Sequence, residues 1–171
     1  SAIPTTELPA TLQEPWAQAP GACFVTLSQN GQLRGCIGSL VAHRSLGDDV
    51  RHNAQSAALH DPRFTPVTPS EVPQLHMEVS VLTSPIPLAF TSQAHALWQL
   101  QPLRDGVIFS AHVNGQTYRS TFLPQVWGQL PDVTQFMAQL KMKAGLPFDF
   151  WSVDVQLETY RVQEFHDAPH A

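Results

Sequence analysis

Arg34 and Cys36 are the residues of this sequence best suited to chemistry, and they lie two positions apart in the run GQLRGCIGS, residues 31–39. A thiolate is a nucleophile, and a nearby guanidinium lowers the pKa of a thiol. Gly35 and Gly38 would let a ligand or another backbone approach closely, because glycine has no side chain. A structural role is the alternative, since free cysteines are commonly buried and glycines also mark bulges. The motif alone leaves both interpretations open.

His76 and Glu78 are the candidate partners of the thiol, because a thiol nucleophile usually needs a base and no histidine lies close to Cys36 in the sequence. Side chains two positions apart on a strand point to one face. We expect Glu78 to be the acid, the base or the partner of Arg34, with His76 as the second choice. A solvated strand edge would explain the same pair. The pair lacks a third ligand for zinc, so no metal site and no cofactor are predicted.

A third candidate group follows the second Asn-Gly pair of the chain, in the run RSTFLPQVW. Arg119 lies there beside Thr121 and Gln125, and an arginine next to hydroxyl and amide groups can bind an anion. An exposed arginine that is simply solvated is the alternative. Arg119 and Thr121 therefore join Arg34, Gly35 and Gly38 as candidate ligand-binding residues.

The composition excludes several classes of protein. A net charge of −5 with only two lysines disfavours a nucleic-acid partner held by a basic face, even though GCIG matches the bare GXXG of an RNA-binding loop. Two cysteines without a Cys-x-x-Cys pair indicate a reducing compartment, so we expect a cytoplasmic protein. No apolar run approaches the roughly 18 residues of a membrane helix.

The chain is predicted to form a proline-rich arm over residues 1–20 and a single domain over 21–171. Four prolines and the absence of any helical or strand period indicate the extended arm. An apolar content of 43% is enough for a core in the remaining chain. Both thiols of this domain are expected to be free.

Asn30-Gly31 predicts a two-residue hairpin turn, and the turn predicts which residues face one another. Without a bulge, Cys36 would lie opposite Val25 and Arg34 opposite Leu27, with Arg34 and Cys36 on the same face as Cys23. Cys23 and Cys36 would then be diagonal neighbours, too far apart for a relaxed disulfide.

The remaining elements are read from periodicity and from capping residues. They are a helix over 45–60, a strand over 75–82, an ambiguous segment over 88–103 with a short helix capped at Thr91 or Ser92, a hairpin around Asn114-Gly115, a helix from Asp132 to Gly145 and a last strand over 151–165. Hairpins mixed with two to four helices, without strict strand–helix alternation, predict an α+β fold whose sheet is largely antiparallel or mixed.

Four blocks of the sequence together carry a family resemblance. They are GACFVTLSQNGQLRGCIGSL, NAQSAALHDPRFTPVT, LHMEVSVL and STFLPQVWGQLPD. In this order they resemble the AMMECR-one domain family, whose bacterial and archaeal members are called AmmeMemoRadiSam system protein A. The hallmark of that family, Leu-Arg-Gly-Cys-Ile-Gly, is intact at residues 33–38, and the resemblance runs from about residue 21 to 165.

The resemblance implies two unequal lobes around a cleft and a genomic association with a Memo-type protein and a radical-SAM enzyme, but no established reaction. Carried over to this sequence, it singles out Arg34, Gly35, Cys36 and Gly38, together with Glu78 and Thr121 from the later blocks. Family members commonly begin with a helix, where this chain is proline-rich. The expected function is a small enzyme or a ligand-binding component that uses a cleft around the hexapeptide. A non-catalytic accessory or scaffold subunit is the alternative, and a regulatory nucleic-acid-binding protein is disfavoured by the charge.

Overall fold

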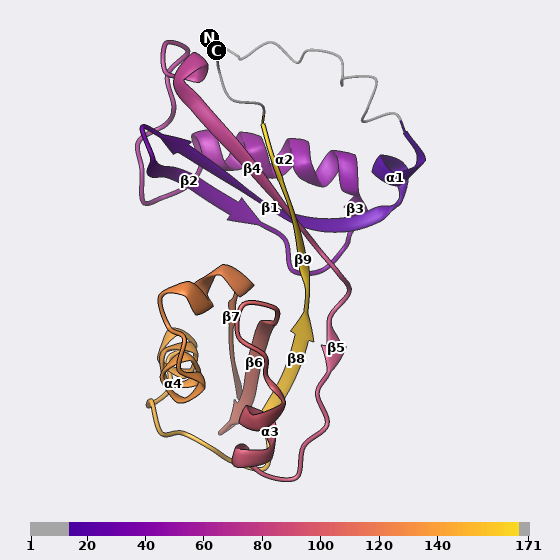
Figure 1. The fold of residues 1–171 in the computed structure, drawn as a ribbon, viewed down its shortest axis with the longest axis vertical. Coiled ribbons are helices and arrows are strands. Elements are labelled where there is room, and N and C mark those ends of the chain that lie inside the picture. The colour runs from indigo at the N-terminus through magenta and orange to yellow at the C-terminus, as the bar shows by residue number, and fades with distance from the viewer. Residues whose placement is uncertain (1–13, 168–171) are drawn as a thin grey trace. The chain divides into compact units, whose positions relative to one another are not determined.

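The computed structural model describes residues 14–167 and divides the chain into two compact units. Unit 1 contains the chain up to Thr83 and the segment from Gln163 onward, whereas unit 2 is Ser84–Val162. Each unit combines a sheet of antiparallel strand pairs with helices (Figure 1). The predicted α+β class is therefore confirmed.

Unit 1 is a sheet with strand order β2-β1-β4-β9, and the two-residue strand β3 pairs with the start of β1. Its elements are α1 (Pro15–Gln18), β1 (Pro20–Gln29), β2 (Gln32–Gly38), β3 (Arg44–Ser45), α2 (Leu46–Leu59), the short 3-10 helix η2 (Val72–Gln74), β4 (Leu75–Leu82) and β9 (Val162–His166). The long helix α2 lies across one face of this sheet, as Figure 1 shows.

The predicted helix over 45–60 is present as α2, and local capping explains where it begins. The Ser45 hydroxyl accepts a hydrogen bond from the amide of Asp48, and two acidic residues in the first turn favour the positive end of the helix dipole. The buried face of α2 packs against alternate residues of β1, namely Cys23, Val25 and Leu27. This packing is the core of unit 1.

The first hairpin has the predicted turn but not the predicted register. Asn30 and Gly31 adopt positive φ angles, and Ser28 pairs with Leu33 as expected. A β-bulge then shifts the ladder by one residue, so that Thr26 lies opposite Cys36. The predicted pairs of Cys36 with Val25 and of Arg34 with Leu27 are wrong, because Arg34 occupies the extra position of the bulge.

The bulge decides which side of the sheet Cys36 occupies, and it places the two cysteines on opposite sides. Cys23 is buried on the side of α2, whereas Cys36 pairs with Thr26 on the opposite side. The prediction of two free thiols is confirmed, but the reason differs from the predicted diagonal arrangement. Burial raises the pKa of the Cys23 thiol to about 12, so Cys23 remains a protonated core residue.

Unit 2 is a four-stranded sheet with strand order β5-β8-β6-β7. Its elements are β5 (Ile86–Pro87), α3 (Gln93–Gln99), β6 (Gly106–Val113), β7 (Gln116–Phe122), the 3-10 helix η3 (Pro124–Gly128), α4 (Val133–Lys143) and β8 (Gln156–Tyr160). The rings of Trp127 and Phe136 stack at the centre of its core, with centroids 3.7 Å apart. Asp132 caps α4 and Gly145 follows its end at φ +96°, as predicted.

Two expectations about the elements need correction, and one short strand is new. The predicted last strand over 151–165 is two strands, β8 and β9, which belong to different sheets, and Val153 before them is 99% exposed. The short strand β5 was not predicted, whereas the predicted short helix is present as α3, capped by Ser92, one of the two expected caps. The described end of the predicted arm contains one helical turn, α1, with Pro15 at its start, whereas residues 1–13 of that arm lie outside the described residues.

Among the residues that the structure describes, none of the helices has both the length and the apolar character needed to cross a bilayer.

Candidate functional site

A row of polar side chains crosses the face of the unit 1 sheet that α2 does not cover. Thr26 on β1 lies between its two register partners, Cys36 on β2 and Glu78 on β4. The Cys36 sulfur is 3.3 Å from the Thr26 Oγ1, and the row ends where Glu78 Oε2 lies 3.4 Å from Nδ1 of His166 on β9. Four neighbouring strands therefore each contribute one polar group to this row, which we call the polar row.

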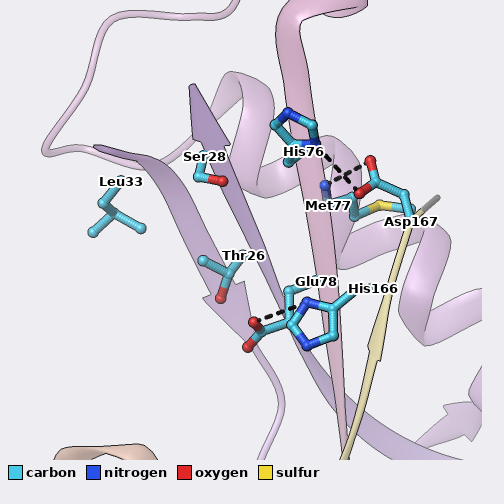
Figure 2. Close-up of a pocket in the computed structure, with 8 residues that line it drawn as sticks. All are labelled: Thr26, Ser28, Leu33, His76, Met77, Glu78, His166 and Asp167. Carbon is cyan, nitrogen blue, oxygen red and sulfur yellow. Dashed lines mark hydrogen bonds and ion pairs between the residues drawn. The ribbon is translucent and has the colours of Figure 1, made fainter. Parts of the chain in front are cut away.

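A pocket of about 250 Å³ lies over the middle of the polar row (Figure 2). Its lining consists of Thr26, Ser28, Leu33, His76, Met77, Glu78, His166 and Asp167. Figure 2 shows Thr26 and Glu78 projecting on the same side of the sheet, with the ring of His166 beside Glu78. Cys36 stands next to Thr26, just outside this lining. The pocket therefore places hydroxyl, carboxylate and imidazole groups along one hollow that a small polar molecule can enter.

His76 and Glu78 are both part of this pocket, and both have partners from the end of the chain. Nδ1 of His76 lies 3.6 Å from Oδ1 of Asp167, and Asp167 also accepts a hydrogen bond from the amide of Met77. Strand β4 pairs with β1 directly beside the first hairpin, as the candidate roles of His76 and Glu78 required. The pairing explains why His76 and Glu78, 40 and 42 positions beyond Cys36 in the sequence, reach its face of the sheet.

The backbone of Cys36 is held by two side chains from the loop after α2. Asp61, which is buried, accepts a hydrogen bond from the Cys36 amide at 3.0 Å, and Arg63 donates one to the Cys36 carbonyl at 3.4 Å. Arg63 and Asp61 also form an ion pair at 2.8 Å. The hydrogen bonds from Arg63 hold the pKa of Asp61 well below its usual range. Cys36 is therefore fixed in place, while its thiol faces the polar row.

Arg34 does not contact Glu78, the partner that the sequence suggested. Its Nε lies 3.1 Å from Oε1 of Glu71, and its Nη1 donates a hydrogen bond to the Thr65 carbonyl at 2.8 Å. Hydrogen bonds from the Thr68 amide and from Arg34 lower the pKa of Glu71 to about 2. Arg34 thus holds the loop between α2 and β4, and an anion-binding role for it stays a prediction.

Both glycines of the hexapeptide are explained by close packing. A Cβ on Gly35 would clash with the carbonyl oxygen of Ala57 in α2, and a Cβ on Gly38 would clash with the ring of Phe24. Neither glycine belongs to the pocket lining. Their predicted role in leaving room for a ligand is therefore not needed to explain them.

The structure separates the remaining predicted residues from this group. Arg119 and Thr121 belong to β7 of unit 2, where Arg119 is exposed and the Thr121 hydroxyl donates a hydrogen bond to the Val107 carbonyl. The Thr121 hydroxyl also lies 2.9 Å from the Tyr160 hydroxyl. These contacts are internal to unit 2, and a ligand-binding role for either residue stays a prediction.

A second hollow of unit 1, of about 670 Å³, lies on the side of the sheet that carries α2. Its lining includes Trp16, Val50, Val79 and Phe165, and no ionisable side chain is among the described residues that line it. This hollow offers apolar contact without groups for chemistry. The polar row is accordingly the better candidate for a functional site.

The residues expected from the sequence did not include Thr26, Asp61 or His166, which the structure places at this site. Thr26 could not be found, because its position beside Cys36 depends on the bulge. The sequence did contain a signal for His166. Glu164 and His166 are two positions apart, as are His76 and Glu78, with the two residue types in the opposite order. Two such pairs on neighbouring strands place four ionisable groups on one sheet.

Comparisons with known proteins agree with the motifs that surround this site. The AMMECR1 family profile matches residues 2–165. The chain belongs to the AMMECR1 family. A relative from Methanothermobacter thermautotrophicus is 40% identical over 94% of this chain and 82% of its own length. One from Thermotoga maritima is 35% identical over 83% of this chain and 75% of its own.

A solved structure supports the fold of this AMMECR1 chain. The crystal structure of uncharacterized protein PH0010 from Pyrococcus horikoshii superposes with a TM-score of 0.83 at 31% identity, covering 95% of this chain and 80% of the other. The AMMECR1 hexapeptide now has a structural explanation in this chain: Arg34 makes the bulge and holds the loop, Gly35 admits α2, and Cys36 joins the polar row.

Proposed function

We propose that this AMMECR1 domain binds a small polar molecule in the pocket over the polar row, and that Cys36 contacts the bound molecule from one side. The observation that carries the proposal is the alignment of Cys36, Thr26, Glu78 and His166 across four strands beside a pocket of about 250 Å³. Pockets that bind small molecules combine a few convergent polar groups in this way.

Within such a complex, Glu78 and His166 are the groups suited to proton transfer. They lie 3.4 Å apart, so that one can hold the proton that the other releases. Cys36 is hydrogen-bonded to Thr26 and stands on a different strand from either group. A cysteine nucleophile is activated by a base within hydrogen-bonding reach, which Thr26 is not. We therefore assign the thiol to ligand contact and the Glu78–His166 pair to acid–base chemistry.

Disulfide trapping with a library of small thiol-reactive fragments tests this assignment. The folded chain is exposed to the library under a competing thiol, and captured fragments are identified by mass spectrometry. A ligand pocket beside Cys36 predicts a narrow set of captured fragments, and Thr26→Val and Glu78→Gln should change that set. The control is Gln116→Cys in a Cys36→Ser background, which places an exposed thiol on the edge of unit 2. If Cys36 captures fragments as indiscriminately as the control thiol, the proposal is wrong.

An accessory role is the alternative that the resemblance leaves, with a Memo-type protein and a radical-SAM enzyme as the associated proteins. It predicts that all three proteins co-purify and that Cys36→Ser and Glu78→Gln leave both the complex and its activity unchanged. The pocket proposal predicts that the same substitutions reduce activity while the complex persists.

We also propose a cytoplasmic location, because both cysteines are free.

A further inference from the structure

Glu78, Glu164 and His166 form a compact group of metal-ligating side chains at the end of the polar row. One donor atom from each residue lies within 4.8 Å of the donor atoms of the other two. Glu164 and His166 are two positions apart on β9, which places them on one face, and β9 is the neighbour of β4 in the sheet. Two adjacent strands therefore bring two carboxylates and one imidazole together.

The charge of this group is incompletely balanced. Among residues 14–167, the only ionic partner of either carboxylate is His166, at 3.4 Å from Glu78 and 3.9 Å from Glu164. One imidazole carries at most a single positive charge, so His166 alone cannot balance two carboxylates. Two like charges at this separation repel each other, and a bound cation would remove the repulsion.

A second observation on the same face also indicates a missing partner. Ser80 is two positions beyond Glu78 on β4 and is 1% exposed. Its hydroxyl is the one buried side-chain oxygen or nitrogen without a hydrogen-bond partner in the described part of the chain. Buried hydroxyls are normally hydrogen-bonded, to protein or to ordered water. The Ser80 hydroxyl therefore lacks a partner on the strand face that also carries Glu78.

We infer that Glu78, Glu164 and His166 bind a divalent transition-metal ion of the Zn²⁺ type. Imidazole and carboxylate are the ligands that such ions accept, at about 2.0 to 2.2 Å. Tetrahedral bonds of that length place donor atoms about 3.4 Å apart, close to the separations already present. Small side-chain movements are enough, because Glu164 and His166 are 42% and 62% exposed.

Three protein ligands would leave at least one position of the ion open, as in catalytic rather than structural zinc sites. Glu78 and His166 also line the pocket, so the open position would face the molecule that the pocket holds. With the ion bound, Glu78 and His166 act as its ligands, and the ion with its own bound water takes over the acid–base role proposed for the pair. The inference rests on the proposed function for the use of the ion, but binding of the ion can be tested by itself. The ligand class it favours for the pocket is a molecule with an oxygen that can coordinate the ion.

The test is titration of the chelator-treated full chain with Co²⁺, followed by absorption spectroscopy, and with Zn²⁺, followed by calorimetry. We expect one ion per chain, with a Kd in the micromolar range and visible absorption bands of Co²⁺ in a site of low coordination number. Glu164→Gln and His166→Gln should each weaken binding by at least about tenfold, since even indirect loss of ligand support costs that much. Both residues are exposed, so the variants should keep the melting temperature of the wild type without metal.

Two controls locate the site. His112→Gln and Glu158→Gln, both in unit 2, should leave affinity unchanged, as should His76→Gln, whose ring pairs with Asp167 in the same pocket. The inference is overturned if no saturable one-to-one binding occurs, if Glu164→Gln and His166→Gln bind as tightly as wild type, or if His76→Gln weakens binding as much as they do. Fragment capture by Cys36 does not depend on these results, so the metal site can fail while the pocket proposal stands.

Discussion

The two Asn-Gly hairpins of this protein begin alike and end differently. In the second, β6 and β7 stay in register from Val113–Gln116 at the turn to Val107–Phe122 at the far end. In the first, the register set by the turn holds for only two pairs before the bulge. The same turn thus fixes a whole ladder in one unit and only its beginning in the other. The difference matters for the candidate site, because the bulge turns Cys36 away from the core and toward the polar row.

The contacts of Arg34 explain why only the first hairpin has a bulge. The extra residue extends its side chain to Glu71 and to the carbonyl of Thr65, in the loop between α2 and β4. No residue of β7 interrupts the ladder in this way. The bulge therefore lets β2 contact a distant loop through Arg34 while its other residues stay paired with β1.

The largest expected effect comes from adding a side chain where the first hairpin approaches α2 most closely. Gly35→Ala should lower the free energy of unfolding by about 3 kcal/mol, because the new Cβ would collide with the Ala57 carbonyl, a backbone group that cannot turn aside. Denaturant unfolding measures the change. Gly128→Ala is the matched control in unit 2, where a Cβ meets nothing within 4 Å. Equal losses in the two variants would show that the approach to α2 is not what requires glycine.

Asp61→Ala should have the next largest effect, about 2 kcal/mol, because the Cys36 amide and Arg63 would both lose a buried charged acceptor. Asp154→Ala, at an exposed position of unit 2, should change stability by less than about 0.5 kcal/mol. The Cys36 amide should also exchange its hydrogen faster in Asp61→Ala, which hydrogen exchange can measure. Unchanged protection of that amide would contradict the role given to Asp61.

Deleting Arg34 should make the first hairpin as regular as the second, at a cost of about 1 kcal/mol for the lost contacts with the loop. Without the extra residue, the turn alone pairs Gly35 with Leu27 and Cys36 with Thr26, so Cys36 should remain on the open face. Alkylation of the folded variant, with peptide mapping, tests this. Cys36 should react at a rate similar to wild type while Cys23 stays protected. Protection of Cys36 would mean that the strand has slipped.

The smallest effect is expected from the pH dependence of the loop contact. The pKa of Glu71 is lowered from an ordinary value of 4.5 to about 2, so its contribution to stability is complete above pH 4.5 and is lost as the pH falls toward 2. Stability falls as the pH falls here because the unfolded chain protonates Glu71 more readily than the folded chain does. Thermal unfolding across this range should show a shallower loss in Glu71→Gln than in wild type. Identical profiles would remove Glu71 from the acid response.

The sequence was sufficient for much of the fold because the signals were local. The caps Ser45 and Asp132, the turn glycines and the alternation over 75–82 all act within a few residues, and each element is present. The split between β8 and β9 was missed because only Arg161, neither a proline nor a glycine, separates them. The strands continue into different sheets for reasons of long-range pairing that no local pattern carries.

The site was predictable only in part, for the same physical reason. Cys36 and Glu78 could be chosen by residue type, and the structure places both in the polar row. Their neighbours Thr26 and His166 depend on the bulge and on the pairing of β9 with β4, which join segments far apart in the chain. The expected contact of Arg34 with Glu78 failed because Glu71, in a loop without regular pattern, lies closer.

The hydrogen bonds of Asp61 and Arg63 with the Cys36 backbone also affect whether copies of this protein can associate. β2 is the outermost strand of its sheet, and a free strand edge is a template on which another chain can pair and aggregate. At Cys36 both backbone groups of that edge are already engaged by charged side chains. An incoming strand would have to displace a buried carboxylate and break its ion pair before it could pair there. The same hydrogen bonds that hold the Cys36 backbone thus also oppose pairing of another chain with the free edge of β2.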